Sequence, residues 1–292
     1  MSQVPVSEAV EVKALDIQHD TEPAQDHGVA RRIPHLGHAA LFFMLGFFMV
    51  NLCALAVFSA LHLKLEAIER HPGYALVSQA LAYALTLGVS AWGFPRLWEK
   101  SFVRGIEWNG LAVKRWWYWM VLTGVAVSAA SQGALHFIPT PETTPFDGLI
   151  QTQHGAWLLM AFAVLLAPLT EEIAFRGFLL PALATAYDWL SLERTPAGLR
   201  KWESSSAHSA SAMVFAAIFS SIPFALLHAS QLSDAWGPLG VLYGVSVVLS
   251  MVRIRTHSVA CSTFVHATYN FTIFVVIYFS TGGFRHLEKL SR

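Results

Sequence analysis

Long apolar runs with few charged residues dominate this chain and decide what it can fold into. Seven such runs are present, at 37–62, 74–95, 116–138, 155–186, 210–228, 236–252 and 257–280. A helix needs roughly 20 mostly apolar residues to cross a bilayer. Only 13% of the residues are charged, whereas a soluble domain carries about 25%. The sequence therefore predicts an all-α fold, a polytopic transmembrane helix bundle with about seven spans, in an integral membrane protein.

The first 35 residues differ from the rest of the chain. The segment "SEAVEVKALDIQHDTEPAQDHG" is polar and acidic and has no apolar pattern. Such a composition is typical of a disordered segment. We therefore expect a disordered cytoplasmic tail at 1–35 and one membrane domain at 36–285.

Lysine and arginine are unevenly placed around the seven runs. They gather before the first run and after the second, fourth and sixth, at Arg31, Arg32, Arg96, Lys100, Arg104, Lys114, Arg115, Arg194, Arg200, Lys201, Arg253 and Arg255. Cytoplasmic loops carry such an excess, so we expect a cytoplasmic N-terminus, in the plasma (inner) membrane if the source is bacterial. Lys and Arg together equal Asp and Glu, 19 each, so no charge balance points to nucleic acid, and the lipid bilayer is the first partner.

Three charged residues interrupt the fourth apolar run, in the segment "LTEEIAFRGF" at 169–178. Glu172 and Arg176 are four residues apart, which lets them form an ion pair on one helix face. Glu171 is rotated by about 100° from Glu172 and points elsewhere. Two adjacent carboxylates in different environments can serve as one structural and one reactive acid. Pro168 lies just before them and removes a backbone donor, which frees a carbonyl inside the helix.

Two later apolar runs also carry polar residues. "SSIPFALLHAS" places His228 four residues after Phe224, and "STFVHATYN" places His266 and Asn270 four residues apart, hence on one face. Polar side chains inside a membrane avoid lipid, so we expect these to converge on one interior cavity with Glu171. Glu and His can activate water, and His with Asn can stabilise an oxyanion.

The ordered segments "EEIAFR", "FALLH" and "HATYN" resemble the motifs of the CPBP family. These are the CAAX-prenyl-protease and bacteriocin-processing intramembrane proteases, also called the Abi family. Their pattern is EExxxR, FxxxH, then HxxxN or HxxxD on successive helices. The resemblance covers about 155–275, the expected catalytic core. "MVRIRTHSV" is similar to the family's arginine-threonine-glycine-serine approach to the last motif, with His257 in place of the glycine.

The resemblance implies an intramembrane endopeptidase with four catalytic residues. Glu171 is then the general base that activates water, and His228 positions or polarises that water. His266 and Asn270 form the oxyanion site. The implied reaction is hydrolysis of a peptide bond in or beside the membrane, near the C-terminal end of a protein or peptide precursor.

Three further residues are implied to support the site. Glu172 and Arg176 would be a supporting pair, in agreement with their helix spacing, and Phe224 would shape the pocket wall. The implied partner is a membrane-anchored or membrane-associated protein or peptide substrate. Relatives process prenylated tails, bacteriocin or pheromone precursors and sorting anchors, and no residue of this chain selects among them.

Other mechanisms and functions stay open. Glu171, His228 and His266 are a ligand set that zinc can use, but the sequence has no HExxH pair, and the resemblance favours a glutamic mechanism without a cofactor. A non-catalytic immunity or scaffold protein of the same family is the first alternative function. A proton-coupled transporter is the second; it predicts two similar halves, whereas these polar residues crowd into the C-terminal half of the chain.

Overall fold

The fold is a bundle of α-helices. A computed structural model describes residues 32–64, 72–141 and 147–288, except for the side chain of Asp147, and it has no strand in these ranges. Most of the predicted tail at 1–35 lies outside the described residues. Within the described ranges, five helices are long and apolar enough to cross a membrane: Leu36–Ala60, Pro72–Trp98, Gln153–Leu190, Trp236–Thr256 and Val259–Ser280. The predicted polytopic transmembrane bundle is therefore confirmed.

The helices follow one another with short connections. Their bounds are α1 Leu36–Ala60, α2 Pro72–Trp98, α3 Phe102–Gly105, α4 Gly110–His136, α5 Asp147–Ile150, α6 Gln153–Ala161, η2 Phe162–Leu166, α7 Ala167–Glu172, η3 Ile173–Leu179, α8 Leu180–Leu190, α9 Pro196–Ser204, α10 Ala210–Leu226, η4 Ser230–Leu232, α11 Trp236–Thr256 and α12 Val259–Ser280. A helix thus lies at each of the seven predicted runs.

Two of those seven helices are not among the five long apolar ones. α10 has 17 residues, close to the lower limit for a span. α4 begins six residues before the predicted run, because the Asn109 side chain accepts hydrogen bonds from the backbone N–H groups of Leu111 and Ala112. Such a cap satisfies free N–H groups of the first turn, so α4 can begin before its apolar run.

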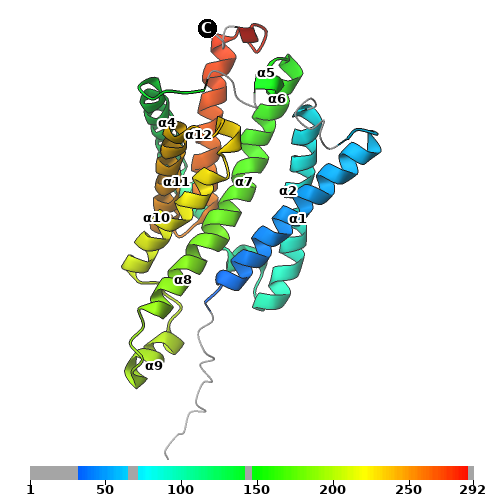
Figure 1. Cartoon of the computed structure of the whole chain (residues 1–292). Coiled ribbons are helices and arrows are strands. Elements are labelled where there is room, and N and C mark those ends of the chain that lie inside the picture. Colours follow the sequence, from blue (N-terminus) through cyan, green and yellow to red (C-terminus); the bar gives the residue numbers. More distant parts are fainter. Residues whose placement is uncertain (1–31, 65–71, 142–146, 289–292) are drawn as a thin grey trace, which may run out of the picture.

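One long helix forms the centre of the bundle. Residues Gln153–Leu190 run without a break through α6, η2, α7, η3 and α8. These 38 residues extend about 57 Å at 1.5 Å per residue, well beyond the ~30 Å hydrocarbon thickness. In Figure 1 the pair α1 and α2 lies on one side of this helix, and α4, α10, α11 and α12 lie on the other. Glu171 is near the middle of the helix and faces the second group.

Close packing fixes α12, which carries two of the predicted site residues, against α4. A Cβ added at Gly124 on α4 would lie 2.7 Å from Cβ of Thr268 and 2.9 Å from the carbonyl oxygen of Val265. Only glycine lets the two backbones approach this closely, as is common between membrane helices. The backbone around His266 is therefore held by helix packing before any side-chain contact is considered.

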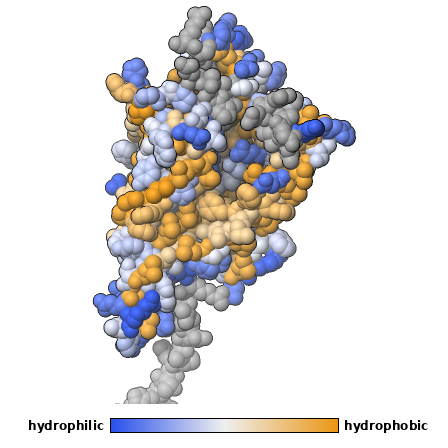
Figure 2. Space-filling view, in the orientation of Figure 1, coloured by the Kyte–Doolittle hydropathy of each residue, from blue (hydrophilic) through white to orange (hydrophobic). Residues whose placement is uncertain are grey.

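The outer surface is apolar where a bilayer would contact it. Large side chains such as Phe47, Leu165 and Val276 are 75%, 69% and 62% exposed. Figure 2 shows apolar side chains over the middle of the visible face, with hydrophilic ones toward its two ends. A surface of this kind is stable in lipid rather than in water, as expected for an integral membrane protein.

Candidate active site

A fully buried ion pair lies at the back of the site. The guanidinium Nη1 of Arg176 donates to Oε1 of Glu172 at 2.9 Å, and both side chains are 0% exposed. Its Nη2 donates to the backbone carbonyl and the hydroxyl of Ser246 on α11, at 2.6 and 2.8 Å. A buried charge needs such partners, because its desolvation is costly. Glu172 and Arg176 thus form the predicted ion pair. Ser246 is a further partner of Arg176 that the motif did not predict.

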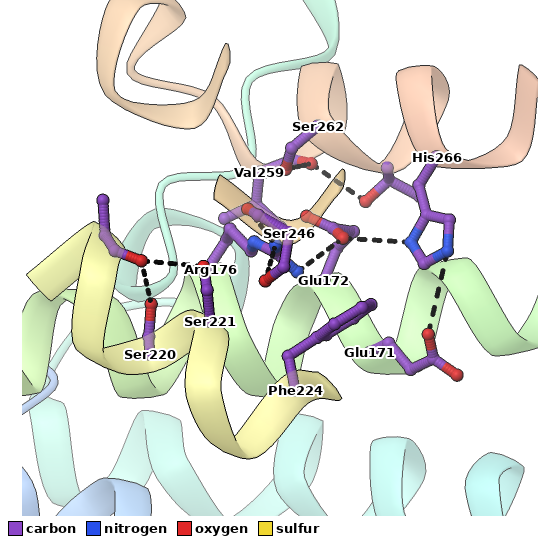
Figure 3. Close-up of polar contacts among 12 residues, drawn as sticks. Glu171, Glu172, Arg176, Ser220, Ser221, Phe224, Ser246, Val259, Ser262 and His266 are labelled. Carbon is purple, nitrogen blue, oxygen red and sulfur yellow. Dashed lines mark hydrogen bonds and ion pairs between the residues drawn. The ribbon is translucent and has the colours of Figure 1, made fainter. Parts of the chain in front are cut away.

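His266 lies between the two adjacent glutamates. Its Nδ1 is 3.0 Å from Oε1 of Glu172, and its Nε2 is 3.8 Å from Oε2 of Glu171. Figure 3 shows the two carboxylates reaching the two ring nitrogens from one helix. Because the Glu172 carboxylate is bound to Arg176 and accepts hydrogen bonds, Nδ1 of His266 is the donor in this contact. Glu172 therefore orients the imidazole, and Nε2 faces Glu171.

His228 lies near the other carboxylate oxygen of Glu171, just after the end of α10. Its Nδ1 is 2.8 Å from the backbone carbonyl of Phe224. A carbonyl only accepts, so Nδ1 carries the proton, and the neutral ring has a lone pair on Nε2. That Nε2 is 3.9 Å from Oε1 of Glu171, too far for a direct hydrogen bond. A water molecule beside the two atoms could hydrogen-bond both of them at ordinary distances.

The Phe224 ring separates the buried ion pair from the open part of the site. Its centroid is 4.8 Å from the Arg176 guanidinium carbon, 4.9 Å from the His228 ring and 6.0 Å from the His266 ring. The side chain is 1% exposed. It therefore keeps solvent away from Arg176 and packs against the two imidazoles, in agreement with the predicted place of Phe224 at the pocket wall.

Asn270 makes a bond that the family motif does not predict. Its Nδ2 donates to the backbone carbonyl of Ala163 at 2.6 Å. That carbonyl lies in η2, a π-helical turn in which the Ala167 N–H bonds to Phe162, five residues back. In the same register the donor for Ala163 would be residue 168, which is Pro168 and has no N–H. Asn270 therefore satisfies the carbonyl that the proline leaves unpaired.

All four predicted catalytic residues line one cavity of about 370 Å³. Glu171, His228, His266 and Asn270 are joined there by Phe224, and the remaining wall is mostly apolar. Glu171 and His228 keep 16% and 19% of their side chains exposed, in contrast to the sealed Glu172. π-Helical turns are frequent at functional sites, and two of them, η2 and η3, flank Glu171 and Glu172.

The alternative zinc set does not form a metal site in this arrangement. Across 32–64, 72–141 and 147–288, no group of three or more His, Cys, Asp or Glu side chains is arranged to hold a metal ion. Nε2 of His228 and Nε2 of His266 face different oxygens of Glu171. Because these residues do not fit a metal as they stand, the mechanism below uses none.

One comparison with known proteins found a relationship. Residues 153–272 match the family model described as type II CAAX prenyl endopeptidase Rce1-like. This match supports the resemblance of the segment to the CPBP family of intramembrane proteases. No match was found among curated proteins or among solved structures. The matched segment runs from the start of α6 into α12 and contains every residue of the cavity cluster described above.

The sequence differs from the CPBP pattern at one position, where the backbone has a left-handed conformation. His257, which replaces the family's glycine, follows α11 with a φ of 48°. This left-handed conformation favours glycine, although His adopts it more often than bulky residues do. Ser258 then caps α12 by accepting from the N–H of Cys261. The turn is therefore kept with histidine, and it delivers His266 two helical turns later.

Several contacts of the site were not predictable from the motifs. The sequence brought Glu171, His228, His266 and Asn270 together, but it did not place His266 between the glutamates or Asn270 on Ala163. It also missed Gln79 on α2, which lines the cavity and donates to the Tyr83 hydroxyl at 3.1 Å. A glutamine within an otherwise apolar run was the only signal for it.

Proposed function

We propose that this chain is a glutamic intramembrane endopeptidase, in which Glu171 activates a water molecule that hydrolyses a peptide bond. One observation carries the proposal. The Glu171 carboxylate faces a cavity, with two imidazole nitrogens 3.8 and 3.9 Å away, while its neighbour Glu172 is sealed in an ion pair. The match of residues 153–272 to the type II CAAX prenyl endopeptidase model supports a protease in general, and the geometry supports this mechanism in particular.

The first step would use a water that lies beside Glu171 and His228, within hydrogen-bond distance of both. A water there can donate one hydrogen to Glu171 and the other to the bare Nε2 of His228. As the water oxygen attacks the scissile carbonyl carbon, Glu171 takes the proton, and the carbonyl π electrons move to its oxygen. General bases of this kind contribute roughly 10²–10⁴-fold in rate. The product of this step is a tetrahedral oxyanion.

The oxyanion would be stabilised from the α12 side. Nδ1 of His266 is held as a donor to Glu172, so Nε2 can donate only when both ring nitrogens carry protons. The nearby Glu172 carboxylate compensates that positive charge. Asn270 has a second N–H on the amide that bonds Ala163. Donors fixed in advance toward a developing negative charge are an effective form of stabilisation.

The second step would return the proton. Glu171, now protonated, gives its proton to the amide nitrogen as the C–N bond breaks. The oxyanion electrons re-form the carbonyl, and the second water proton leaves with the carboxyl product. One water is consumed and one peptide bond is broken, with no other reactant. Glu171 ends the cycle ionised and ready for the next water.

The proposal includes the setting of this reaction. The substrate is a membrane-anchored or membrane-associated polypeptide. The charge distribution of the loops supports a cytoplasmic N-terminus, in the plasma membrane for a bacterial source. Glu171 is central in a 38-residue helix, and His266 is the eighth residue of α12. The C-terminal part of the long helix, α8, extends past the start of α12. Glu171 and His266 therefore lie at the same depth.

Comparison of newly formed protein termini tests the function directly. The chain is expressed in its host as wild type, as Glu171→Gln and as the matched control Glu193→Gln, which changes an exposed carboxylate. Membrane and secreted proteins are then compared for new termini. We expect termini beside apolar segments with wild type and the control, and none with Glu171→Gln. Identical profiles at equal amounts of folded protein would contradict the proposal and favour the immunity or scaffold alternative.

A further inference from the structure

One segment of α4 carries cations and aromatic rings that the proposed active site does not use. Residues 114–119 read "KRWWYW", and we call them the basic-aromatic segment. All six are exposed; the four aromatic side chains are 40–58% exposed, whereas the next residue, Met120, is 7% exposed. Successive residues of a helix are turned by about 100°, so the four rings point in directions that cover most of the helix circumference. No single neighbouring helix could cover them all.

The length of α4 places this segment at the level of the lipid headgroups. From Trp116 to His136, the last residue of α4, the helix rises about 30 Å, which is the thickness of the hydrocarbon core. Lys114 and Arg115 come directly before this length, and the aromatic rings lie at its edge. Trp and Tyr are enriched at this boundary of a bilayer. The two cations are therefore at the depth of the phosphate groups of one leaflet.

Neither cation of this segment has an acidic partner among the described residues. The guanidinium carbon of Arg115 is 5.3 Å from the centroid of the Trp116 ring, within the range of a cation–π contact. Glu107, the nearest acid in the sequence, is bound to Arg253 at 2.8 Å. A guanidinium beside a ring keeps its N–H groups free, and their planar arrangement matches the oxygens of a phosphate. The segment therefore offers two cations to an anion from outside the chain.

We propose that the basic-aromatic segment binds the headgroup of an anionic phospholipid, with Lys114 and Arg115 on the phosphate and the rings against the upper part of the acyl chains. Charge complementarity favours this occupant, because anionic lipids are attracted to basic residues that adjoin a membrane helix. A choline headgroup would add a cation beside the two that are already there. Lipid can also contact a helix from several sides at once, as the directions of the rings require. The inference does not depend on the proposed protease activity.

Binding of two lipids with the same acyl chains tests the inference without turnover. The full-length protein in detergent is titrated with fluorescent phosphatidylglycerol or fluorescent phosphatidylcholine. We expect wild type to bind phosphatidylglycerol about tenfold more tightly, and Lys114→Gln/Arg115→Gln to lose this preference, because each basic residue near a membrane surface contributes about fivefold. The matched control Arg200→Gln/Lys201→Gln changes two exposed cations of α9 and should keep it. Equal binding of the two lipids by wild type, tighter binding of phosphatidylcholine, or equal loss in both double variants would overturn the inference.

A charge-keeping variant separates a specific contact from general attraction to a positive surface. Arg115→Lys keeps the charge and removes the planar guanidinium beside Trp116. We expect the affinity for phosphatidylglycerol to fall about threefold, because a lysine cannot bind a phosphate through two parallel N–H groups. Unchanged affinity would mean that charge alone attracts the lipid, and Arg115 would not be a headgroup ligand.

The mass of the protein in the same samples tests the competing occupant, a second copy of this chain. We expect wild type and Lys114→Gln/Arg115→Gln to have the same mass. A wild-type dimer that this double variant converts to a monomer would show that the basic-aromatic segment binds a second copy, and the inference would be wrong.

Discussion

The two adjacent glutamates are in opposite environments, and the contrast separates structure from chemistry. Glu172 is fully buried and bound to Arg176 and His266 at hydrogen-bond distances. Glu171 is partly exposed in the cavity, and its two imidazole neighbours are 3.8 and 3.9 Å away. On the sealed side, Oε1 of Glu172 contacts both Arg176 and His266, whereas neither oxygen of Glu171 is within hydrogen-bond distance of an imidazole. One residue of rotation on a helix is enough to create this difference.

The largest effect is expected on the open side, at the base itself. Glu171→Gln keeps the shape of the side chain and removes its ability to take a proton. We expect activity to fall by about 10²–10⁴-fold, with thermal stability close to wild type because the residue has no direct hydrogen bond to lose. Cleavage of a wild-type substrate peptide by purified protein measures the first, and thermal unfolding in detergent measures the second.

The next effect belongs to the sealed side. Arg176→Met leaves the Glu172 carboxylate buried without its cation, and breaking such a pair costs about 3–5 kcal/mol. We expect a large drop in thermal stability and loss of activity as a consequence. The double variant Glu172→Gln/Arg176→Met removes both charges and should recover part of the stability. If the single variant unfolded at the wild-type temperature, the Glu172–Arg176 ion pair would not be needed for stability, and the assignment of Glu172 as the structural acid would be wrong.

A smaller effect is expected at Asn270, which lines the cavity and bonds the Ala163 carbonyl. Asn270→Ala leaves the Ala163 carbonyl without its donor, which costs about 1–3 kcal/mol for a buried group, and it also removes a predicted oxyanion donor. Asn51→Ala is the matched control, because Asn51 also donates an amide N–H to a carbonyl, that of Phe47, but on an exposed face. Similar unfolding temperatures for the two variants would mean that the Ala163 bond contributes no special stability.

The smallest effect is expected on removal of metal ions. The described residues offer no cluster arranged to hold a metal, and the proposed mechanism uses none. Treatment of the purified protein with a chelator should therefore change the cleavage rate by less than about twofold, because the attacking water is not activated by a metal ion. A loss that zinc restores would return Glu171, His228 and His266 to the role of metal ligands.

Local patterns predicted part of this fold and site. Apolar runs marked seven helices because length and composition decide what can cross a bilayer, and the spacing of Glu172 and Arg176 placed them on one face. The π-helical register that turns the Ala163 carbonyl toward Asn270 has no sequence signature, because it depends on packing against α12. The contact of His266 with Glu172 joins residues 94 positions apart, and no local pattern specifies it.

The depth of the site shows the same limit. The end of the fourth run was expected at residue 186, but the helix continues to Leu190 and leads into α9, so its apolar length does not define its position in the bilayer. Only the contacts between Glu171, His228 and His266 show that the three lie at one level. The sequence motifs therefore identify the site residues, whereas the packing of the helices sets the depth of the site in the membrane.

The most direct test of the division between the glutamates is a side-by-side measurement of Glu171→Gln and Glu172→Gln. Both variants are purified, and the unfolding temperature and the rate of substrate cleavage are measured for each. We predict that Glu171→Gln keeps its stability and loses cleavage, whereas Glu172→Gln loses stability because the Arg176 charge is left buried. Equal loss of stability in both, or substantial cleavage by Glu171→Gln, would contradict the assignment of one structural and one catalytic acid.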